Sequence, residues 1–370
     1  MRRTALIAAT LICALRASAA DAGLIPWQEF TPHGEFIGET VGNVAGGLAR
    51  GSTATAYFQG GFDWIGASNG ADPGGKLVVR YLGVDTGQPD ALYVGDVQGV
   101  SNLTTPTNIN RLFKLYFRQR LGAVTTRFGL MDANDYFDSV QADRYLLCAS
   151  YGIFPVWSTN LPGTSTYPYS SLGAIVSVGG SRHQLEAGVF GGNALHPFLH
   201  PTQSGTLALI QYNQSGSLGA GTYALKLGGF FNHQSPRAAA LLGPQLNGFF
   251  GSGVYRFRAA GLDWGTFLIG GGAPNAVASV PWYLGGGVRL KNWYPGQPGD
   301  VLSVGFSRAS LSGQPHAETD YEATAIFKVC AGVEIQPDIQ VIAHPGGHLP
   351  TAVAGILRIR VDVVRLFAQR

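Results

Sequence analysis

The sequence predicts an all-β fold: a transmembrane antiparallel β-barrel of about 16 strands, with short periplasmic turns and longer extracellular loops. Polar and apolar residues alternate with a period of two in segment after segment, and residues at i and i+2 of a strand share a face. Each such strand therefore has one polar and one apolar side. Together with an N-terminus typical of export, this repetition favours a closed barrel that is apolar towards lipid and wet inside.

The first segment, residues 1–20, is predicted to be a signal peptide. It begins with Arg2 and Arg3, continues with an apolar run over residues 5–15, and ends on the small residues Ala17-Ser18-Ala19. The apolar run is too short to span a bilayer, which takes about 20 residues as a helix. We therefore expect residues 21–370 to form one outer-membrane barrel domain.

The composition excludes several classes of protein. No later stretch reaches the roughly 18 uninterrupted apolar residues of a transmembrane helix, although apolar residues make up 45% of the sequence. Without the arginines of the signal peptide, 22 Lys and Arg balance 22 Asp and Glu, so no basic excess favours a nucleic-acid partner. Cys148 and Cys330 are too few for a disulfide scaffold, and whether they pair stays open.

Candidate strands recur along the whole chain, and no linker or change of composition marks a second domain. The alternation is clearest over residues 334–341 and 353–363 near the C-terminus. Roughly 20 to 22 residues for each strand and its connection match the chain length to the expected number of strands. The other predicted strands cover residues 75–84, 111–120, 124–130, 184–190, 206–212, 222–231, 254–260, 301–307 and 321–329.

Several predicted strands carry charged residues opposite their bulkiest apolar groups. Over residues 111–120, for example, the alternation turns Phe113, Leu115 and Phe117 towards lipid. A charge that faces lipid near the midplane costs ~2 to 4 kcal/mol, so the opposite face should line the interior. For a single arginine the alternative is a strand end, from which the side chain reaches the interface. We predict that the aqueous path through the barrel is lined by Lys114, Tyr116, Arg118, Arg127, Arg256, Arg258, Glu334, Gln336, Asp338, Gln340, Arg358, Arg360 and Asp362.

A set of collinear motifs extends over nearly the whole of residues 21–370. The motifs include residues 95–102, Arg111-Leu112-Phe113, Arg127-Phe128-Gly129-Leu130, Glu318-Thr319-Asp320-Tyr321-Glu322, residues 335–340 and Pro345-Gly346-Gly347. Together they resemble the carbohydrate-selective porins of the OprB family. The resemblance implies a single-channel outer-membrane barrel. It also implies that small sugars diffuse passively through the barrel into the periplasm of a Gram-negative bacterium.

The chain departs from the family pattern at three places. Lys114 stands where family members usually carry a Glu, which reverses the sign of one lumen charge. The N-terminal helical segment of the relatives is cut down to residues 21–30, and Phe367 is followed by further residues instead of ending the chain. The resemblance therefore implies the fold, whereas the preferred sugar does not follow from it.

A sugar channel needs hydrogen-bonding side chains that replace water and aromatic rings that pack on the C–H faces of sugars. Tyr116 and Trp282 are candidates for such contacts if they face inward. The alternative for every tryptophan is the aromatic girdle at the membrane interface. The tryptophans concerned are Trp27, Trp64, Trp157, Trp264, Trp282 and Trp293.

Enzyme motifs are weak, and no catalytic, cofactor or metal site is predicted. Residues 70–77 have the spacing of a phosphate-binding loop, but Leu77 stands where a hydroxyl would bind the metal. Two histidine pairs with a spacing of four residues stand beside prolines, which disfavour the helix that such a metal site needs: His196 with His200, and His344 with His348.

Three classes of function remain compatible with the sequence. The first is a sugar-selective porin, the second a general or anion-preferring diffusion porin, and the third a non-transport barrel such as a lipid-acting enzyme or an adhesion scaffold. The expected partners are small sugars as transported solutes and outer-membrane lipid, with no nucleic acid. Either a monomer or a homotrimer is compatible with the sequence.

Overall fold

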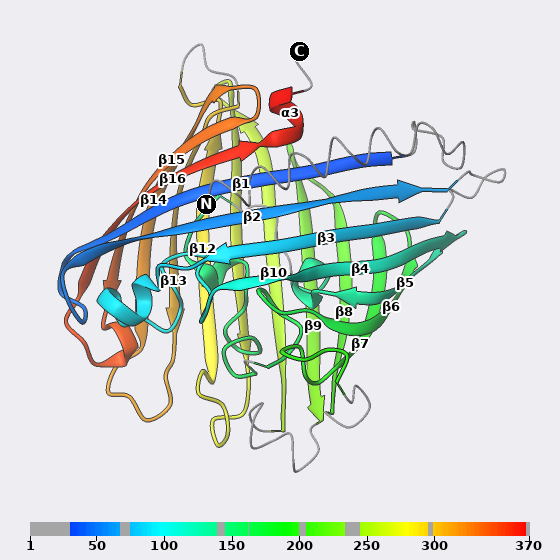
Figure 1. The fold of residues 1–370 in the computed structure, drawn as a ribbon, viewed down its shortest axis with the longest axis horizontal. Coiled ribbons are helices and arrows are strands. Elements are labelled where there is room, and N and C mark those ends of the chain that lie inside the picture. Colours follow the sequence, from blue (N-terminus) through cyan, green and yellow to red (C-terminus); the bar gives the residue numbers. More distant parts are fainter. Residues whose placement is uncertain are drawn as a thin grey trace.

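The fold is a closed barrel of antiparallel strands. The computed structural model describes residues 30–66, 75–138, 145–161, 163–199, 205–233, 245–294 and 299–367. Within these ranges sixteen strands pair in chain order, and β1 (Phe30–Ala45) closes the ring by pairing with β16 (Ala352–Asp362) (Figure 1). The predicted fold class is confirmed. The predicted signal peptide lies outside the described residues.

The strands between β1 and β16 follow one another around the ring, with a few short helices in the connections. These helices are η2 (Asp90–Val94), η3 (Ala133–Asp135), η4 (Ala149–Tyr151), η5 (Pro345–Gly347) and α3 (Val363–Phe367). The strands are β2 (Gly51–Ile65), β3 (Lys76–Asp85), β4 (Ile109–Leu121), β5 (Val124–Met131), β6 (Ser171–Gly179), β7 (His183–Gly191), β8 (Thr206–Leu218), β9 (Gly221–His233), β10 (Leu246–Ala259), β11 (Leu262–Gly272), β12 (Trp282–Lys291), β13 (Val301–Ala309), β14 (Glu318–Cys330) and β15 (Val333–Ala343). No helix among the described residues is long and apolar enough to cross a membrane.

The connections differ in length at the two ends of the barrel. Tight turns join β4 to β5 and β14 to β15 at one end, whereas long segments join β3 to β4 and β5 to β6 at the other. Transmembrane barrels place their short turns in the periplasm and their longer loops outside the cell. We call these ends the short-turn side and the long-loop side.

The alternation predicted for β16 appears in its burial. Ile356 and Arg358 are buried on the inward face, whereas Leu357 and Ile359 are exposed on the outer face. Arg358 pairs across the sheet with Glu39 of β1. The polar side of the strand therefore faces the interior.

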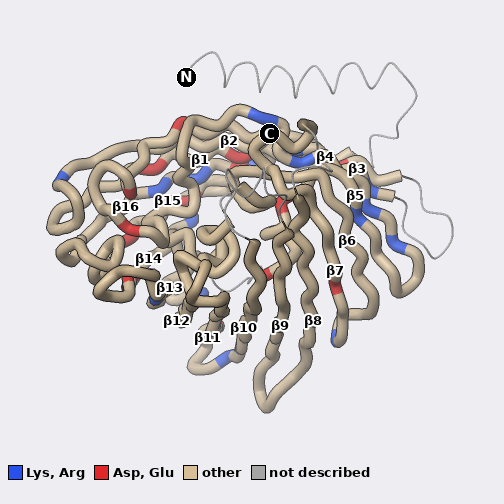
Figure 2. The backbone as a smooth tube through the Cα atoms, turned by 90° about the horizontal axis from the view of Figure 1, so that it is seen from below, with Lys and Arg blue, Asp and Glu red and all other residues tan. Residues whose placement is uncertain are grey.

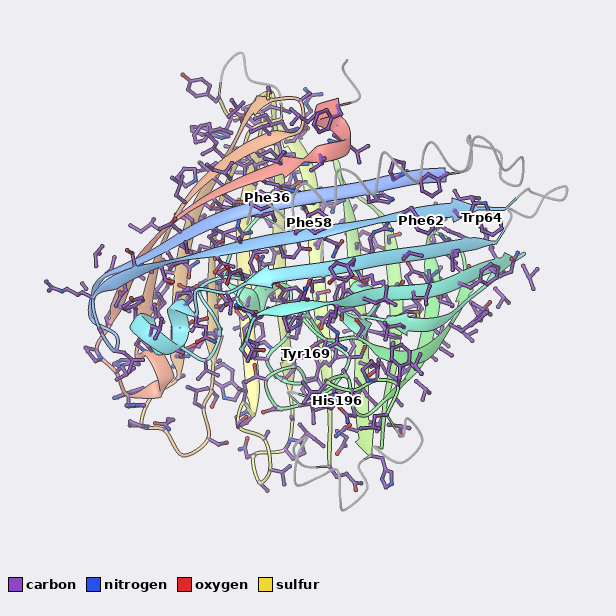
Figure 3. The ribbon with its side chains drawn as sticks, viewed as in Figure 1. Phe36, Phe58, Phe62, Trp64, Tyr169 and His196 are labelled. Carbon is purple, nitrogen blue, oxygen red and sulfur yellow. The ribbon has the colours of Figure 1, made fainter. Side chains whose placement is uncertain are left out.

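Aromatic residues lie on the outer face of the first two strands. Phe36 lies on β1, and Phe58, Phe62 and Trp64 lie on β2 (Figure 3). Trp282 is 41% exposed beside Leu284 on the outer face, so it does not face the lumen.

The alternative prediction, a place in the aromatic girdle at the membrane interface, is wrong for Trp157. This side chain is fully buried inside the barrel, in a connection that returns to the interior. A tryptophan in a long loop thus belongs to the internal core and not to the membrane interface. Trp27 lies outside the described residues.

A β-bulge in β4 overturns the predicted facing of Phe113. Arg80 of β3 pairs with Lys114, and the next residue, Tyr81, pairs with Leu112, so Phe113 is the extra residue. Phe113 is 2% exposed and packs inside the barrel, whereas Leu115 is exposed on the outer face. The inserted residue breaks the two-residue alternation. The prediction that Phe113 shares the lipid face of Leu115 is therefore wrong.

Five strands were not predicted from the sequence: β1, β2, β6, β11 and β12. In β12 the inward face is short of side chains because Gly285 and Gly287 lie there. A Cβ atom at Gly285 would lie 2.6 Å from the Tyr283 hydroxyl, and one at Gly287 would lie 2.7 Å from the ring of Phe267. Aromatic rings occupy this space, and the glycines leave room for them. The same glycines interrupt the alternation of polar and apolar residues by which a strand is predicted.

Two connections fold back into the barrel. The first inward segment, residues 86–108, packs its Val94 and Val100 against Ile342 and Ile356 of the wall. The second inward segment comprises the described residues 132–138, 145–161 and 163–170. Its apolar residues form one cluster with the opposite wall, including Tyr151, Phe154, Trp157, Phe190, Phe230, Phe250, Phe267 and Tyr283. A large part of the lumen is thus filled by a hydrophobic core.

The two cysteines of the barrel domain are free thiols. Cys148 is buried in the second inward segment, and Cys330 is exposed at the end of β14. The open question of a disulfide is answered: the pair is not bonded in this structure.

We predict that single cysteines on β16 report the two faces of the strand, in a background that lacks Cys148 and Cys330. A cysteine at Arg360 should react with a membrane-impermeant thiol reagent, because its side chain faces the aqueous interior. A cysteine at Ile359 should stay unlabelled in lipid. Equal labelling at both positions, measured by mass shift in intact vesicles, would contradict the register.

Candidate functional site

Carboxylates on the inward face of β14 hold the first inward segment. Both oxygens of Glu318 accept backbone N–H groups: Oε1 from Gln98 at 2.9 Å, and Oε2 from Val97 at 2.9 Å and from Gly346 at 2.7 Å. Glu318 is fully buried. One side chain thus fixes the loop between β3 and β4 to the loop between β15 and β16.

The second inward segment is held in the same way, four residues further along β14. Glu322 accepts hydrogen bonds from the backbone N–H groups of Leu147 and Cys148, the latter at 3.0 Å. A hydrogen bond of this kind stabilises by about 0.5 to 1.5 kcal/mol net. The family-like motif at residues 318–322 is therefore an anchor for both inward segments.

Polar side chains of β15 and β16 add to this anchor. Gln336 Nε2 donates to the carbonyl oxygen of Tyr145 at 2.7 Å, and Gln340 Nε2 donates to that of Val100 at 2.8 Å. Arg358 Nη2 donates to Asn102 Oδ1 at 2.9 Å. We call these three residues together with Glu318 and Glu322 the clamp residues. Three adjacent strands thus grip both segments.

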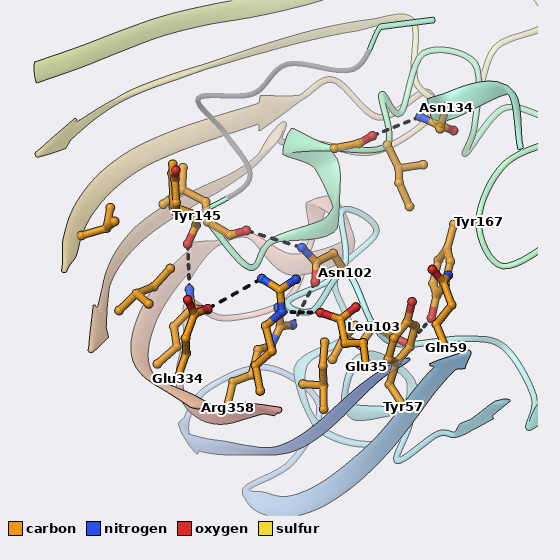
Figure 4. Close-up of a pocket in the computed structure, with 18 of the residues that line it drawn as sticks. Glu35, Tyr57, Gln59, Asn102, Leu103, Asn134, Tyr145, Tyr167, Glu334 and Arg358 are labelled. Carbon is orange, nitrogen blue, oxygen red and sulfur yellow. Dashed lines mark hydrogen bonds and ion pairs between the residues drawn. The ribbon is translucent and has the colours of Figure 1, made fainter. Parts of the chain in front are cut away.

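A cavity of about 640 Å³ remains between the inward segments and the wall, and we call it the inner cavity. It extends to the short-turn side, because Glu334 lies near the start of β15 and Arg360 near the end of β16. Figure 4 shows Tyr57 and Tyr167 on one side of it and Tyr145 and Glu334 on the other.

Charges of both signs lie in the inner cavity. Arg360 forms an ion pair with Glu35, and its Nη1 lies 3.7 Å from Glu334 Oε2. Arg358 Nη2 lies 2.5 Å from Glu39 Oε2. In Figure 2 basic and acidic residues lie close together along β1, β2, β15 and β16. The paired charges offer a solute both donors and acceptors of hydrogen bonds.

Of the predicted lining residues, Glu334, Gln336, Arg358 and Arg360 line the inner cavity. Asp338 and Gln340 instead lie buried beneath the first inward segment, where Gln340 Nε2 lies 3.1 Å from Asp338 Oδ1. Neither residue lines the inner cavity.

Lys114, Tyr116 and Arg127 face inward but contact the second inward segment. Lys114 Nζ lies 2.5 Å from Asp135 Oδ2, and Asp135 itself lines the inner cavity. Arg127 lies over the ring of Tyr136, with its Cζ atom 4.8 Å from the ring centroid, and Tyr116 meets the same ring edge-on. Lys114 therefore has a local counter-charge in Asp135.

The other predicted residues lie near strand ends or beside neighbouring cations. The side chain of Arg258 is 74% exposed and its Nε lies 3.7 Å from Asp263. Asp362 pairs with Arg365, and Arg118 is exposed near the end of β4. Arg256 lies in one row across the sheet with Gly265 and Arg289. These positions lie outside the lining of the inner cavity.

The sequence reasoning missed several lining residues. Lys291 and Lys328 line the inner cavity, and Lys291 Nζ lies 5.2 Å from the centroid of the Tyr145 ring. On β1 it missed Glu35, which lies two residues from Ile37 on the same inward face. The available signals were the cations at i and i+2 in Arg289 and Lys291, and the alternation of acidic residues in β1.

Solved structures of porins share this architecture. The high-pH structure of Pseudomonas putida OprB superposes with a TM-score of 0.78 at 15% identity, covering 90% of this chain and 94% of that one. The low-pH structure of the same protein gives 0.59 at 13% identity, with coverage of 90% and 92%. A mutant of the Rh. blastica porin gives 0.57 at 12% identity, with coverage of 90% and 99%. At these identities the likeness concerns the fold.

The sequence itself gives the family. No sequence among the curated proteins matches this chain. Residues 51–235 and 253–362 match the family described as carbohydrate-selective porin, OprB family. Because these residues make up most of the barrel, the chain belongs to the OprB family of carbohydrate-selective porins.

Proposed function

We propose that this porin lies in the outer membrane of a Gram-negative bacterium and lets small neutral sugars diffuse passively to the periplasm through the inner cavity. In this role it catalyses no reaction. The observation that carries the proposal is the inner cavity, with its paired charges and its three tyrosines beside the clamped segments. Its volume of about 640 Å³ falls in the range of small-molecule sites.

The lining of the inner cavity supports passage of hydroxyl-rich solutes. The ion pairs of Arg360 with Glu35 and Glu334 present N–H donors next to carboxylate acceptors. A sugar hydroxyl both donates and accepts, so it can replace water at such pairs. The faces of Tyr57 and Tyr145 offer apolar surface for sugar C–H groups. Several weak contacts favour entry without slow release.

The clamp residues keep the passage through the lumen narrow, which a selective channel requires. They hold the inward segments against β14, β15 and β16, so the lumen cannot widen by movement of a loose loop. Most of the holding groups are buried, which shields their hydrogen bonds from competition with water. Selectivity then depends on the wall of a fixed passage.

A preference for anions is a second candidate property. Lys291 and Lys328 line the inner cavity, and among the described ion pairs neither ammonium group has a carboxylate partner. Glu35 and Glu334 share the cation Arg360, and Asp135 pairs with Lys114. With Asp132 included, the lining contains as many acidic as basic side chains, so a preference for anions depends on the two lysines, whose ammonium groups have no ion-pair partner.

We predict that neutral sugars enter the channel and reduce the ion current. Single channels in a planar bilayer should lose conductance when millimolar glucose or a disaccharide is added, because a bound sugar obstructs the inner cavity. Swelling of liposomes in isotonic sugar should show net uptake. If neither sugar changes the current and the liposomes do not swell, the channel does not pass sugars and the proposal is contradicted.

We predict that Glu322→Ala widens the channel. The substitution leaves two buried N–H groups unpaired, at a cost of about 1 to 3 kcal/mol each, and loosens the second inward segment. Single-channel conductance should rise and become noisier. The matched control is Glu186→Ala, a buried inward carboxylate on β7 that bonds to Ser177 and Asn213 of the wall. Equal conductance in both variants would show that Glu322 does not set the width.

We predict that Lys291→Gln moves the ion preference towards cations, because it removes from the inner cavity a positive charge that has no ion-pair partner. Lys114→Glu should act in the same direction, since it releases the cavity residue Asp135 from its partner. Arg258→Gln, at an exposed strand end, is the control. The measurement is the reversal potential in a salt gradient. A shift in the control as large as in Lys291→Gln would place the selective charge elsewhere.

A further inference from the structure

A second cavity of about 520 Å³ lies among the connections on the long-loop side, and we call it the outer cavity. Its walls come from both inward segments. Hydroxyl and amide side chains dominate its polar lining, and the described residues that line it include no lysine or arginine. The hydroxyl and amide side chains among them include Gln88, Gln98, Ser101, Thr104, Ser158 and Thr159.

Tyr167 stands between the two cavities. It lines both of them, as does Ile153. The hydroxyl of Tyr167 donates to the carbonyl oxygen of Leu103 at 2.8 Å, and its ring meets Phe113 edge-on with the centroids 6.2 Å apart. Ser101 lines the outer cavity and Leu103 the inner one. The two cavities therefore follow one another through the barrel, and the ring of Tyr167 separates them.

The wall of the outer cavity contains acceptors that no protein donor satisfies. Gln98 Oε1 and Thr104 Oγ1 are buried and make no hydrogen bond. Buried polar groups almost always have a partner, so these two atoms in the wall of one cavity are candidate partners for a solute. A solute with several hydroxyl groups supplies the missing donors once these side chains turn towards it.

The charges around the outer cavity disfavour anions. Asp90 and Asp96 line it without a basic neighbour in the lining. Burial, with the carboxyl groups of Asp90 and Glu318 nearby, raises the pKa of Asp96 well above its ordinary range. A neutral polyol meets no repulsion here, whereas a carboxylate or phosphate would.

Tyr169 gives the outer cavity an aromatic surface. Its ring lines the cavity and is held by Arg111, whose Cζ atom lies 5.4 Å from the ring centroid (Figure 3). Arg111 is itself fixed by a hydrogen bond from Nη2 to the carbonyl oxygen of Ala194 at 3.1 Å. The ring is therefore in place for the C–H face of a sugar.

We propose that the outer cavity is a second sugar subsite, in series with the inner cavity, and that it takes neutral sugars in preference to sugar acids. This inference rests on the proposed function, since it assumes that sugars cross the barrel. A sugar that enters from the long-loop side is held at Tyr169 and then passes Tyr167 into the inner cavity.

The test is the association rate of glucose added to one side of single channels in a planar bilayer. Labelling of the exposed Cys330, at the β14–β15 turn, with an impermeant thiol reagent shows which compartment the short-turn side faces. In Tyr169→Ala the rate from the long-loop side should fall about fivefold, the worth of one aromatic contact. The rate from the short-turn side should stay as in the wild type.

Three comparisons complete the experiment. Tyr169→Phe keeps the ring and should restore the rate. Arg258→Gln, at an exposed strand end that lines neither cavity, should leave the rates from both sides unchanged. Glucuronate should block the wild type from that side more weakly than glucose. If Tyr169→Ala does not fold, as judged by heat-dependent gel mobility, Thr104→Val removes one orphan acceptor and carries the same expectation.

The outcomes separate the inference from the proposed function. An equal fall from both sides, no fall in Tyr169→Ala, or a stronger block by glucuronate would overturn the outer subsite while sugar passage stands. A wild-type channel that glucose blocks from neither side would instead contradict the proposed function.

Discussion

The structure depends on hydrogen bonds between buried side chains of the wall and the backbone of the inward segments. A loop inside a barrel carries N–H and C=O groups that need partners once water is excluded. Glu318 and Glu322 accept from the N–H groups, and Gln336 and Gln340 donate to carbonyl oxygens. With these bonds the connections become part of the wall, and the wide lumen of a sixteen-stranded ring becomes two small cavities.

The two sides of the lumen are built by different forces. On the side of β7 to β12 the second inward segment packs through aromatic rings such as Trp157 and Phe154, by burial of apolar surface. On the side of β14 to β16 it is held by charge and hydrogen bonding. The solute path lies next to the polar side because paired charges such as Arg360 and Glu35 remain accessible there.

The sequence predicted those features that follow from local alternation. The inward facing of Arg358 and Arg360, the fold class and the family all came from period-two patterns and motif order. The bulge at Phe113 was not predictable, since one extra residue leaves no local mark. Nor were the roles of Asp338 and Gln340, because a polar inward residue reads the same whether it meets water or a folded-in loop. The apolar residues of the second inward segment, Phe154 among them, were the available sign of internal packing.

The glycines of β12 have a consequence for how such channels can diversify. Aromatic rings occupy the space that side chains at these glycines would fill. A larger residue at Gly285 or Gly287 would therefore collide with Tyr283 or Phe267. That half of the barrel can change only if β12 and the aromatic rings packed on it change together, which single substitutions rarely achieve. The lining of the polar half has no such coupling at Glu334 or Lys291. New solute preferences in this lineage should therefore arise by substitution in that half, over an inherited and nearly fixed aromatic half.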